Sequence, residues 1–148
     1  MTLDQFTRHY LIAALWSSNV SNEAGNGAAL DNYFDIDDIG PNTINQAIED
    51  CRDFQQANAA LLERAYTFYR ENGNAAHPDA GSPEACAGHD FWLTRNLHGA
   101  GFWDRGMPGS LGQDLTEAAH GYGGVDIDQF DMLDPTASGA LDNEQEEN

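Results

Sequence analysis

Apolar residues recur at helical spacing in several parts of the chain, beginning close to the N-terminus. Phe6, Tyr10 and Ala14 share one face of a helix that would cover residues 3–17. Thr2 precedes this stretch, and Gln5 follows three residues later, which is the spacing of a capping box. The pattern therefore predicts a first helix over residues 3–17 with Thr2 as its N-cap.

The longest periodic stretch covers residues 42–71. Apolar residues follow one another there at intervals of three or four, and Asn58 is the single polar interruption of the stripe. The members of this stripe are Ile44, Ile48, Cys51, Phe54, Leu61, Ala65 and Phe68. Pro41 suits the first position of a helix, and Gly73 suits the position just after its end. We therefore expect one continuous helix over residues 42–71.

Two shorter helices are predicted further along the chain. Ser82 and Pro83 are the residue types preferred at an N-cap and at the first helical position, so we expect a helix from residue 83 to about 96. The glycine-rich run 99–101 then requires a loop. Residues 114–122 predict another short helix.

These elements predict a mainly α fold. We expect one compact domain of about four helices over residues 1–134, with α+β as the alternative. Residues 125–134 alternate apolar and acidic positions, which predicts a small strand or an irregular acidic segment. Residues 135–148 are acidic, contain no base and are expected to form a disordered tail.

The charge balance narrows the classes of partner. Twenty-five acids face six bases, all of them Arg, and the formal net charge is −19. Such a chain repels nucleic acid and anionic membranes, and favours a partner with a basic surface. Adaptation to high salt or a need for solubility would produce the same composition. The sequence shows no transmembrane run and no signal-peptide pattern, so a cytoplasmic location is expected.

Residues 88–106, GHDFWLTRNLHGAGFWDRG, concentrate the unusual side chains of the chain. In one interpretation the four large aromatics form part of the core, and the buried His, Arg and Asp groups satisfy one another. In the other they line a ligand pocket suited to acid–base work or anion binding. The pocket residues would be His89, Trp92, Arg95, His98, Trp103, Asp104 and Arg105. No known catalytic motif is present, so no catalytic residue is assigned.

The cysteines and histidines give little support to a metal site. Cys86, His89 and His98 could supply zinc ligands, but their spacing matches no standard zinc finger. Cys51 and Cys86 form no C-x-x-C motif and are expected to be free thiols. We therefore predict no metal and no cofactor.

The run 88–106, the start FTRHYLIAALWSS and the stretch DNYFDIDDIGP resemble a family of small acidic proteins carried by bacteriophages and other mobile elements. The resemblance covers residues 1 to about 122. It implies a phage gene product acting inside a bacterial host, and it carries no catalytic residue with it. The family pattern ends in a short acidic hairpin, where this chain has VDIDQFDMLD.

Together, these observations lead to two functional hypotheses. The first is an anti-defence interaction protein that inhibits a host nucleic-acid-binding complex, such as a CRISPR effector, a restriction enzyme or a nuclease. Acidic side chains would imitate the phosphates of DNA on its surface. The residues expected to do so are Asp31, Asp35, Asp37, Asp38, Glu49, Asp50, Asp53, Asp126, Asp128 and Asp131. The alternative is a binder of a nucleotide or anion, or an enzyme, that uses the segment 88–106.

Overall fold

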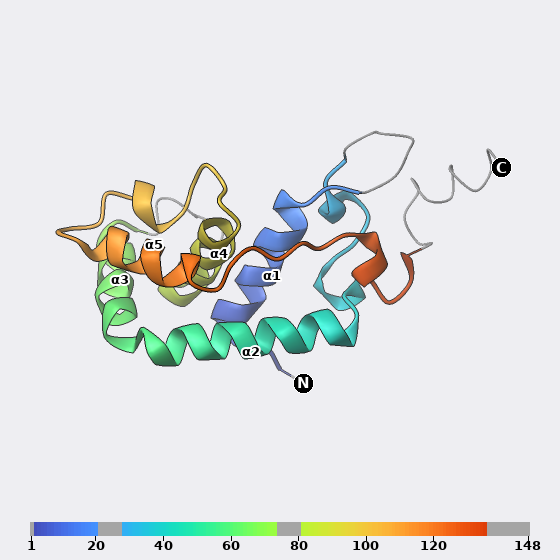
Figure 1. Ribbon diagram of the computed structural model, residues 1–148, viewed down its shortest axis with the longest axis horizontal. Coiled ribbons are helices and arrows are strands. Elements are labelled where there is room, and N and C mark those ends of the chain that lie inside the picture. The colour runs from blue at the N-terminus through green and yellow to red at the C-terminus, as the bar shows by residue number, and fades with distance from the viewer. Residues whose placement is uncertain (1, 21–27, 74–80, 136–148) are drawn as a thin grey trace.

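Five α-helices and four 3-10 turns build the described part of the chain (Figure 1). The computed structural model describes residues 2–20, 28–73 and 81–135. The helices are α1 Gln5–Ser17, α2 Pro41–Ala57, α3 Ala59–Glu71, α4 Pro83–Arg95 and α5 Leu111–His120. The turns are η1 Leu30–Asn32, η2 Ile36–Asp38, η3 Phe102–Asp104 and η4 Gln129–Asp131. The predicted mainly α fold is confirmed.

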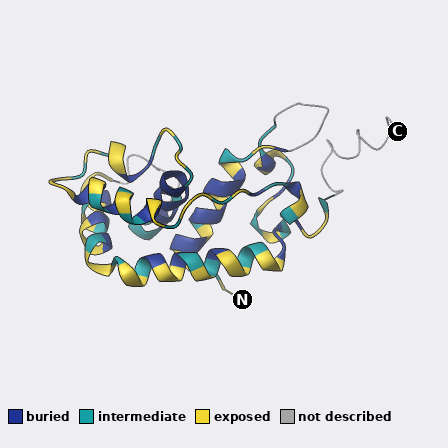
Figure 2. Cartoon of the chain, viewed as in Figure 1, coloured by how far each residue is buried: buried dark blue, intermediate teal, exposed yellow. Residues whose placement is uncertain are grey.

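Helix α4 is the central element of the core. Ten of its residues are buried, so it has almost no solvent-facing side (Figure 2). Its contact with α1 is the most extensive between any two described elements. The rings of Phe54 and Phe91 stack at 4.1 Å between centroids and join α2 to α4. Phe6, Tyr10 and Phe102 pack around this pair.

A glycine allows α1 and α4 to approach closely. A Cβ atom on Gly88 would lie 2.0 Å from the backbone oxygen of Phe6, well inside van der Waals contact. Any side chain at position 88 would therefore push the two helices apart. Because α4 also carries the ion pairs described below, this crossing fixes the position of most of the core.

The helix predicted over residues 42–71 is in fact two helices. The chain bends at Asn58, whose backbone is not helical, and α3 turns away from the line of α2 (Figure 1). The side-chain amide of Asn58 donates a hydrogen bond to the backbone oxygen of Phe54 at 3.0 Å, which stabilises the end of α2. The bend lets α3 pack against α4 and α5, which a straight helix would not reach.

The other predicted boundaries are correct to within a few residues, with two corrections. The N-cap of α1 is Asp4, which accepts a hydrogen bond from the backbone of Thr7 at 2.7 Å, and not Thr2. Helix α5 begins at Leu111, three residues before the predicted start. Helix α4 begins after Ser82 as expected.

The acidic run 125–134 forms no strand. It is an irregular segment that contains η4, and its only β-type pairing within the described residues is the isolated bridge Ile39↔Met132. Residues 21–27, between α1 and η1, and nearly all of the predicted tail, at residues 136–148, lie outside the described residues.

Replacing Gly88 by Ala should destabilise the protein by at least about 2 kcal/mol, because the new methyl group collides with the backbone of α1. Helix propensity alone would stabilise the variant by about 1 kcal/mol, so the sign of the change separates the two effects. The measurement is urea unfolding followed by circular dichroism. Gly99→Ala is the matched control, because nothing lies within 4 Å of its added Cβ. Equal stabilities of the two variants would contradict the close crossing.

Candidate functional site

Asp90 and Arg105, which lie near the two ends of the segment 88–106, form a buried ion pair. The Nη2 atom of Arg105 lies 2.7 Å from Oδ1 of Asp90, whose side chain is fully buried. The hydroxyl of Tyr69 donates a hydrogen bond to Oδ2 of Asp90 at 2.5 Å. Burial raises the pKa of Tyr69, and the nearby Asp90 carboxylate raises it further. Burial alone would lower the pKa of Arg105, but its contact with Asp90 outweighs this effect and raises that pKa. This cluster joins α3, α4 and the turn after α4.

Arg95, the last residue of α4, makes a second ion pair. Its Nη1 atom lies 2.8 Å from Oδ2 of Asp50 on α2 and donates to the hydroxyl of Tyr10 at 3.0 Å. Its other nitrogens donate to the backbone oxygens of Tyr122 and Gly123. The guanidinium is thus held by four groups inside the protein and joins α1, α2, α4 and the segment after α5.

The remaining polar residues of the segment 88–106 point to separate places. Trp92 is buried, and its indole nitrogen donates to the hydroxyl of Ser17 at 2.7 Å. The ring of His89 contacts the ring of Trp16, and Asp104 accepts a hydrogen bond from the backbone of Gly101. Trp103 is exposed, and His98 lines a shallow hollow together with Trp92. Of the seven predicted pocket residues, Trp92 and His98 are the two that share this hollow.

Both cysteines are buried free thiols, as expected. Burial raises the pKa of Cys86 to about 11 and also raises that of Cys51. Both therefore remain protonated near neutral pH, where the thiolate is the reactive form. Among residues 2–20, 28–73 and 81–135, no three His, Cys, Asp or Glu side chains come close enough to hold a metal ion. In the same residues no helix has the length and apolar character needed to cross a membrane.

Two turns built in the same way carry many of the predicted partner-binding acids. In η2 the carboxylate of Asp35 accepts a hydrogen bond from the backbone of Asp37, and Asp38 accepts one from the backbone of Asp35, both at 2.9 Å. In η4 Asp128 and Asp131 repeat this arrangement, again at 2.9 Å. Each turn therefore fixes two carboxylates through hydrogen bonds from its own backbone.

A short antiparallel contact brings the two turns together. Ile39 and Met132 form an isolated bridge. The backbone nitrogen of Gly40 donates to the oxygen of Asp131 at 2.8 Å, and that of Leu133 donates to the oxygen of Asp38 at 2.7 Å. The hydroxyl of Thr43 donates to the Asp131 carboxylate at 3.4 Å. Two acidic stretches that are far apart in the sequence thus lie side by side.

We call the surface formed by these two turns the acidic end. Residues 28–51 and 123–135, which build it, contain no Arg or Lys. Its members are exposed or half-buried. They are Asp35, Asp37, Asp38, Asp126, Asp128 and Asp131. This end of the molecule therefore presents negative charge without a nearby basic side chain from either segment.

The other predicted acids have different surroundings. Asp50 is ion-paired with Arg95, and Asp53 accepts a hydrogen bond from the hydroxyl of Tyr122. Glu49 is exposed on α2, and Asp31 is exposed in η1. Two of the carboxylates of α2 are thus held by side chains from distant parts of the chain, whereas four of those at the acidic end are held by the backbone of their own turns.

Two large apolar side chains lie exposed at the acidic end, although no pattern in the sequence marks them. Phe130 is 66% exposed and Leu133 is 65% exposed, and they flank Asp131 and Met132. The alternating pattern of residues 125–134 does not reveal them, because η4 changes the phase of the alternation. Gln129 is fully buried as a result, and Phe130 points outward.

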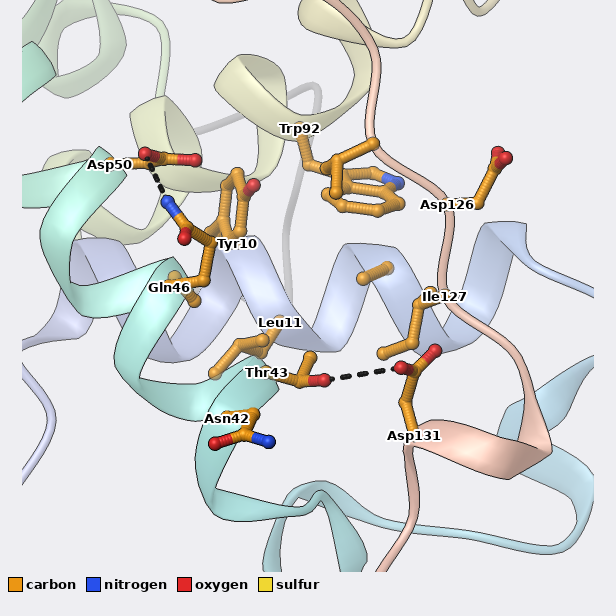
Figure 3. Close-up of a pocket in the computed structure, with 13 residues that line it drawn as sticks. Tyr10, Leu11, Asn42, Thr43, Gln46, Asp50, Trp92, Asp126, Ile127 and Asp131 are labelled. Carbon is orange, nitrogen blue, oxygen red and sulfur yellow. Dashed lines mark hydrogen bonds between the residues drawn. The ribbon is translucent and has the colours of Figure 1, made fainter.

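A pocket of about 200 Å³ opens next to the acidic end, between α1, α2 and the segment 125–131 (Figure 3). Apolar atoms make up most of its wall, and Trp92 is its only contribution from the segment 88–106. The residues around it are Tyr10, Leu11, Ala14, Asn42, Thr43, Gln46, Ala47, Asp50, Trp92, Val125, Asp126, Ile127 and Asp131. It contains three carboxylates and no basic side chain.

Comparison with known proteins gave no match to a family model, a curated protein or a solved structure. The resemblance to small acidic proteins of mobile elements therefore stays a prediction.

Replacing Arg105 by Met should lower the free energy of unfolding by about 3–5 kcal/mol, because it leaves the Asp90 carboxylate buried without its counter-charge. Urea unfolding at neutral pH would measure the loss. Arg64→Met is the control, since Arg64 is exposed on α3. The double variant Asp90→Asn/Arg105→Met should recover part of the stability. A double variant no more stable than Arg105→Met would show that the unpaired charge is not the cause.

Proposed function

We propose that this chain is an interaction protein whose acidic end binds the basic, nucleic-acid-binding surface of another protein and thereby competes with nucleic acid. The observation that carries the proposal is the pairing of η2 with η4, which gathers carboxylates from two distant stretches on one surface. Acids needed only for solubility or for high salt have no reason to gather in this way. A local concentration of one charge steers an oppositely charged partner during association.

The rigidity of the carboxylates also supports this function. Four of the six belong to capping boxes, and the bridge between Ile39 and Met132 joins the two turns. A binding surface that is already ordered loses less conformational entropy when it meets a partner. The phosphates of DNA are likewise held at fixed positions along a regular backbone, so an ordered set of carboxylates is a better substitute than a mobile one.

The exposed side chains of Phe130 and Leu133 favour a protein as the partner. Large apolar and aromatic side chains commonly anchor protein interfaces, with charged residues around them. Direct binding of nucleic acid or of an anionic membrane is disfavoured by the net charge of −19. In the bacterial cytoplasm that the mobile-element resemblance implies, the partner would be a defence complex such as a CRISPR effector, a restriction enzyme or a nuclease.

The alternative function, a nucleotide or anion site in the segment 88–106, has less support. The guanidinium groups of Arg95 and Arg105, its expected anion clamps, are both paired with carboxylates inside the protein. A bound phosphate would have to displace Asp50 or Asp90, and the displaced carboxylate would remain close to it.

The sharpest test reverses charges that do not hold the fold. Asp35, Asp38, Asp128 and Asp131 cap their turns, so substituting them would disturb structure and binding together. Asp37→Lys/Asp126→Lys changes two exposed carboxylates that cap no turn. We expect this variant to lose capture of nucleic-acid-binding proteins from bacterial lysate, because it places positive charge opposite a basic surface. Mass spectrometry identifies the captured proteins, and added duplex DNA should release those bound by the unaltered chain.

The matched control is Glu63→Lys/Glu71→Lys, which makes the same change in net charge on exposed positions of α3. It should retain capture. If both double variants lose the same proteins, net charge and not the acidic end governs binding. If DNA releases nothing, the bound surface is not one that binds nucleic acid.

Phe130→Ser should weaken binding of the captured partner by about tenfold, the usual cost of removing an aromatic anchor from an interface. The thermal stability should change little, because the ring is 66% exposed. Binding would be measured by calorimetry with the purified partner. Trp103→Ser, which removes an aromatic ring of similar exposure from η3, should leave the affinity unchanged. Equal effects of the two substitutions would argue against a specific role of Phe130.

A further inference from the structure

The pocket beside the acidic end has two chemically different parts. Its inner wall is formed by Leu11, Ala14 and Ala47 together with Ile127, and the rings of Tyr10 and Trp92 complete it (Figure 3). These surfaces offer no charge and favour a hydrocarbon portion of a ligand.

The rim of the pocket is polar and acidic. Asn42, Thr43 and Gln46 from α2 provide hydroxyl and amide groups, and three carboxylates complete the rim. The carboxylate of Asp50 is already paired with Arg95, whereas Asp126 and Asp131 form no ion pair within residues 2–20, 28–73 and 81–135. Asp131 points toward Thr43 on the side of the pocket away from Trp92 (Figure 3).

Each oxygen of Asp131 accepts one hydrogen bond, from Thr43 at 3.4 Å or from the backbone of Asp128 at 2.9 Å. A carboxylate offers about four acceptor positions, so Asp131 can accept further donors from a ligand. Asp126 is exposed at the edge of the pocket and can add a second negative charge. An anionic ligand would be repelled by the same two groups.

We propose that this pocket binds an organic cation with an apolar stem, that is, an alkylguanidinium or alkylammonium group. The stem lies against Leu11, Ala47 and Ile127, and the charged head reaches Asp131, while Asp126 adds negative charge at the edge of the pocket. Hydrogen bonds between a cationic donor and a carboxylate are stronger than neutral ones, which fixes the orientation of the ligand. The inference rests on the pocket itself and does not depend on the proposed function.

The test is a titration of the full chain with n-butylguanidinium, followed by proton–nitrogen NMR. The indole N–H of Trp92 is a convenient probe, because it is buried and bonded to Ser17 while Trp16 and Trp103 are exposed. We expect saturable shifts of this indole and of the backbone amides of Thr43 and Ala47. Butyrate should produce no such shifts, and n-butanol should bind more weakly than the cation. Equal binding of n-butanol, or an absence of saturable shifts, would overturn the proposal.

Asp131→Asn should weaken n-butylguanidinium binding by about tenfold, the loss expected when a charge-assisted hydrogen bond becomes a neutral one. The amide oxygen of Asn can still accept the hydrogen bond from Asp128, which preserves the turn, and unchanged amide spectra outside the pocket would verify this. Asp126→Asn, which changes no capping residue, gives a second measurement of how a carboxylate of the pocket affects n-butylguanidinium binding, and we expect weaker binding there too. Asp37→Asn is the control, because Asp37 belongs to the acidic end and does not line the pocket. A loss with Asp37→Asn equal to that with Asp131→Asn would indicate diffuse attraction and would overturn the specific site.

A cation of this class could be a free amine or the side chain of an Arg or Lys in another protein. A blocked tripeptide, acetyl-Gly-Arg-Gly-amide, distinguishes these sources. Binding at least as tight as that of n-butylguanidinium would support a side chain presented by a partner. Exclusion of the peptide with retained binding of n-butylguanidinium would support a small free amine. Because no protein partner takes part in these titrations, binding of the cation without any capture from lysate would contradict only the proposed function.

Discussion

Burial of α4 on nearly every side is the constraint on which the rest of the structure depends. The helix carries Asp90 and Arg95 away from water, and a buried charge without a partner costs several kcal/mol. Each charge is therefore met by a side chain from elsewhere. Arg105 returns to Asp90 after the turn that follows α4, and Asp50 reaches Arg95 from α2. These pairs determine where that turn, α2 and the segment after α5 lie around the central helix.

Local signals were enough to predict most of the helices. Ser82 and Pro83 marked the start of α4 because an N-cap and a first-turn proline depend only on neighbouring residues. The bend at Asn58 was harder to predict, because the buried positions keep their spacing of three or four through it. The prediction of Thr2 as the N-cap of α1 is wrong for a different reason. Thr2 and Asp4 both have suitable side chains, but Asp4 also accepts a hydrogen bond from Gln55 of α2 at 3.2 Å, a contact that no local pattern contains.

The surroundings of the acidic residues could not be predicted because they too depend on contacts between distant parts of the chain. In the sequence all carboxylates look alike. In the folded protein they differ in the partners that distant parts of the chain provide. Asp50 and Asp90 became internal members of ion pairs, and Asp53 became an acceptor for Tyr122. The pairing of η2 with η4 depends on backbone hydrogen bonds between residues that lie far apart in the sequence. Each turn has a D-x-x-D spacing, but this local spacing contains no information about the contact between the two turns.

This separation of the charges has a consequence for the acidic end. The two buried arginines are used within the core, and the other four, Arg8, Arg52, Arg64 and Arg70, are exposed on α1, α2 and α3. Backbone N–H groups stabilise the carboxylates of η2 and η4 individually, but they carry no net charge to cancel the repulsion between them. Folding therefore fixes these carboxylates close together while leaving their combined charge uncompensated. A cation or a basic surface that binds there gains from groups that are already ordered, and it also relieves a repulsion that the fold itself maintains.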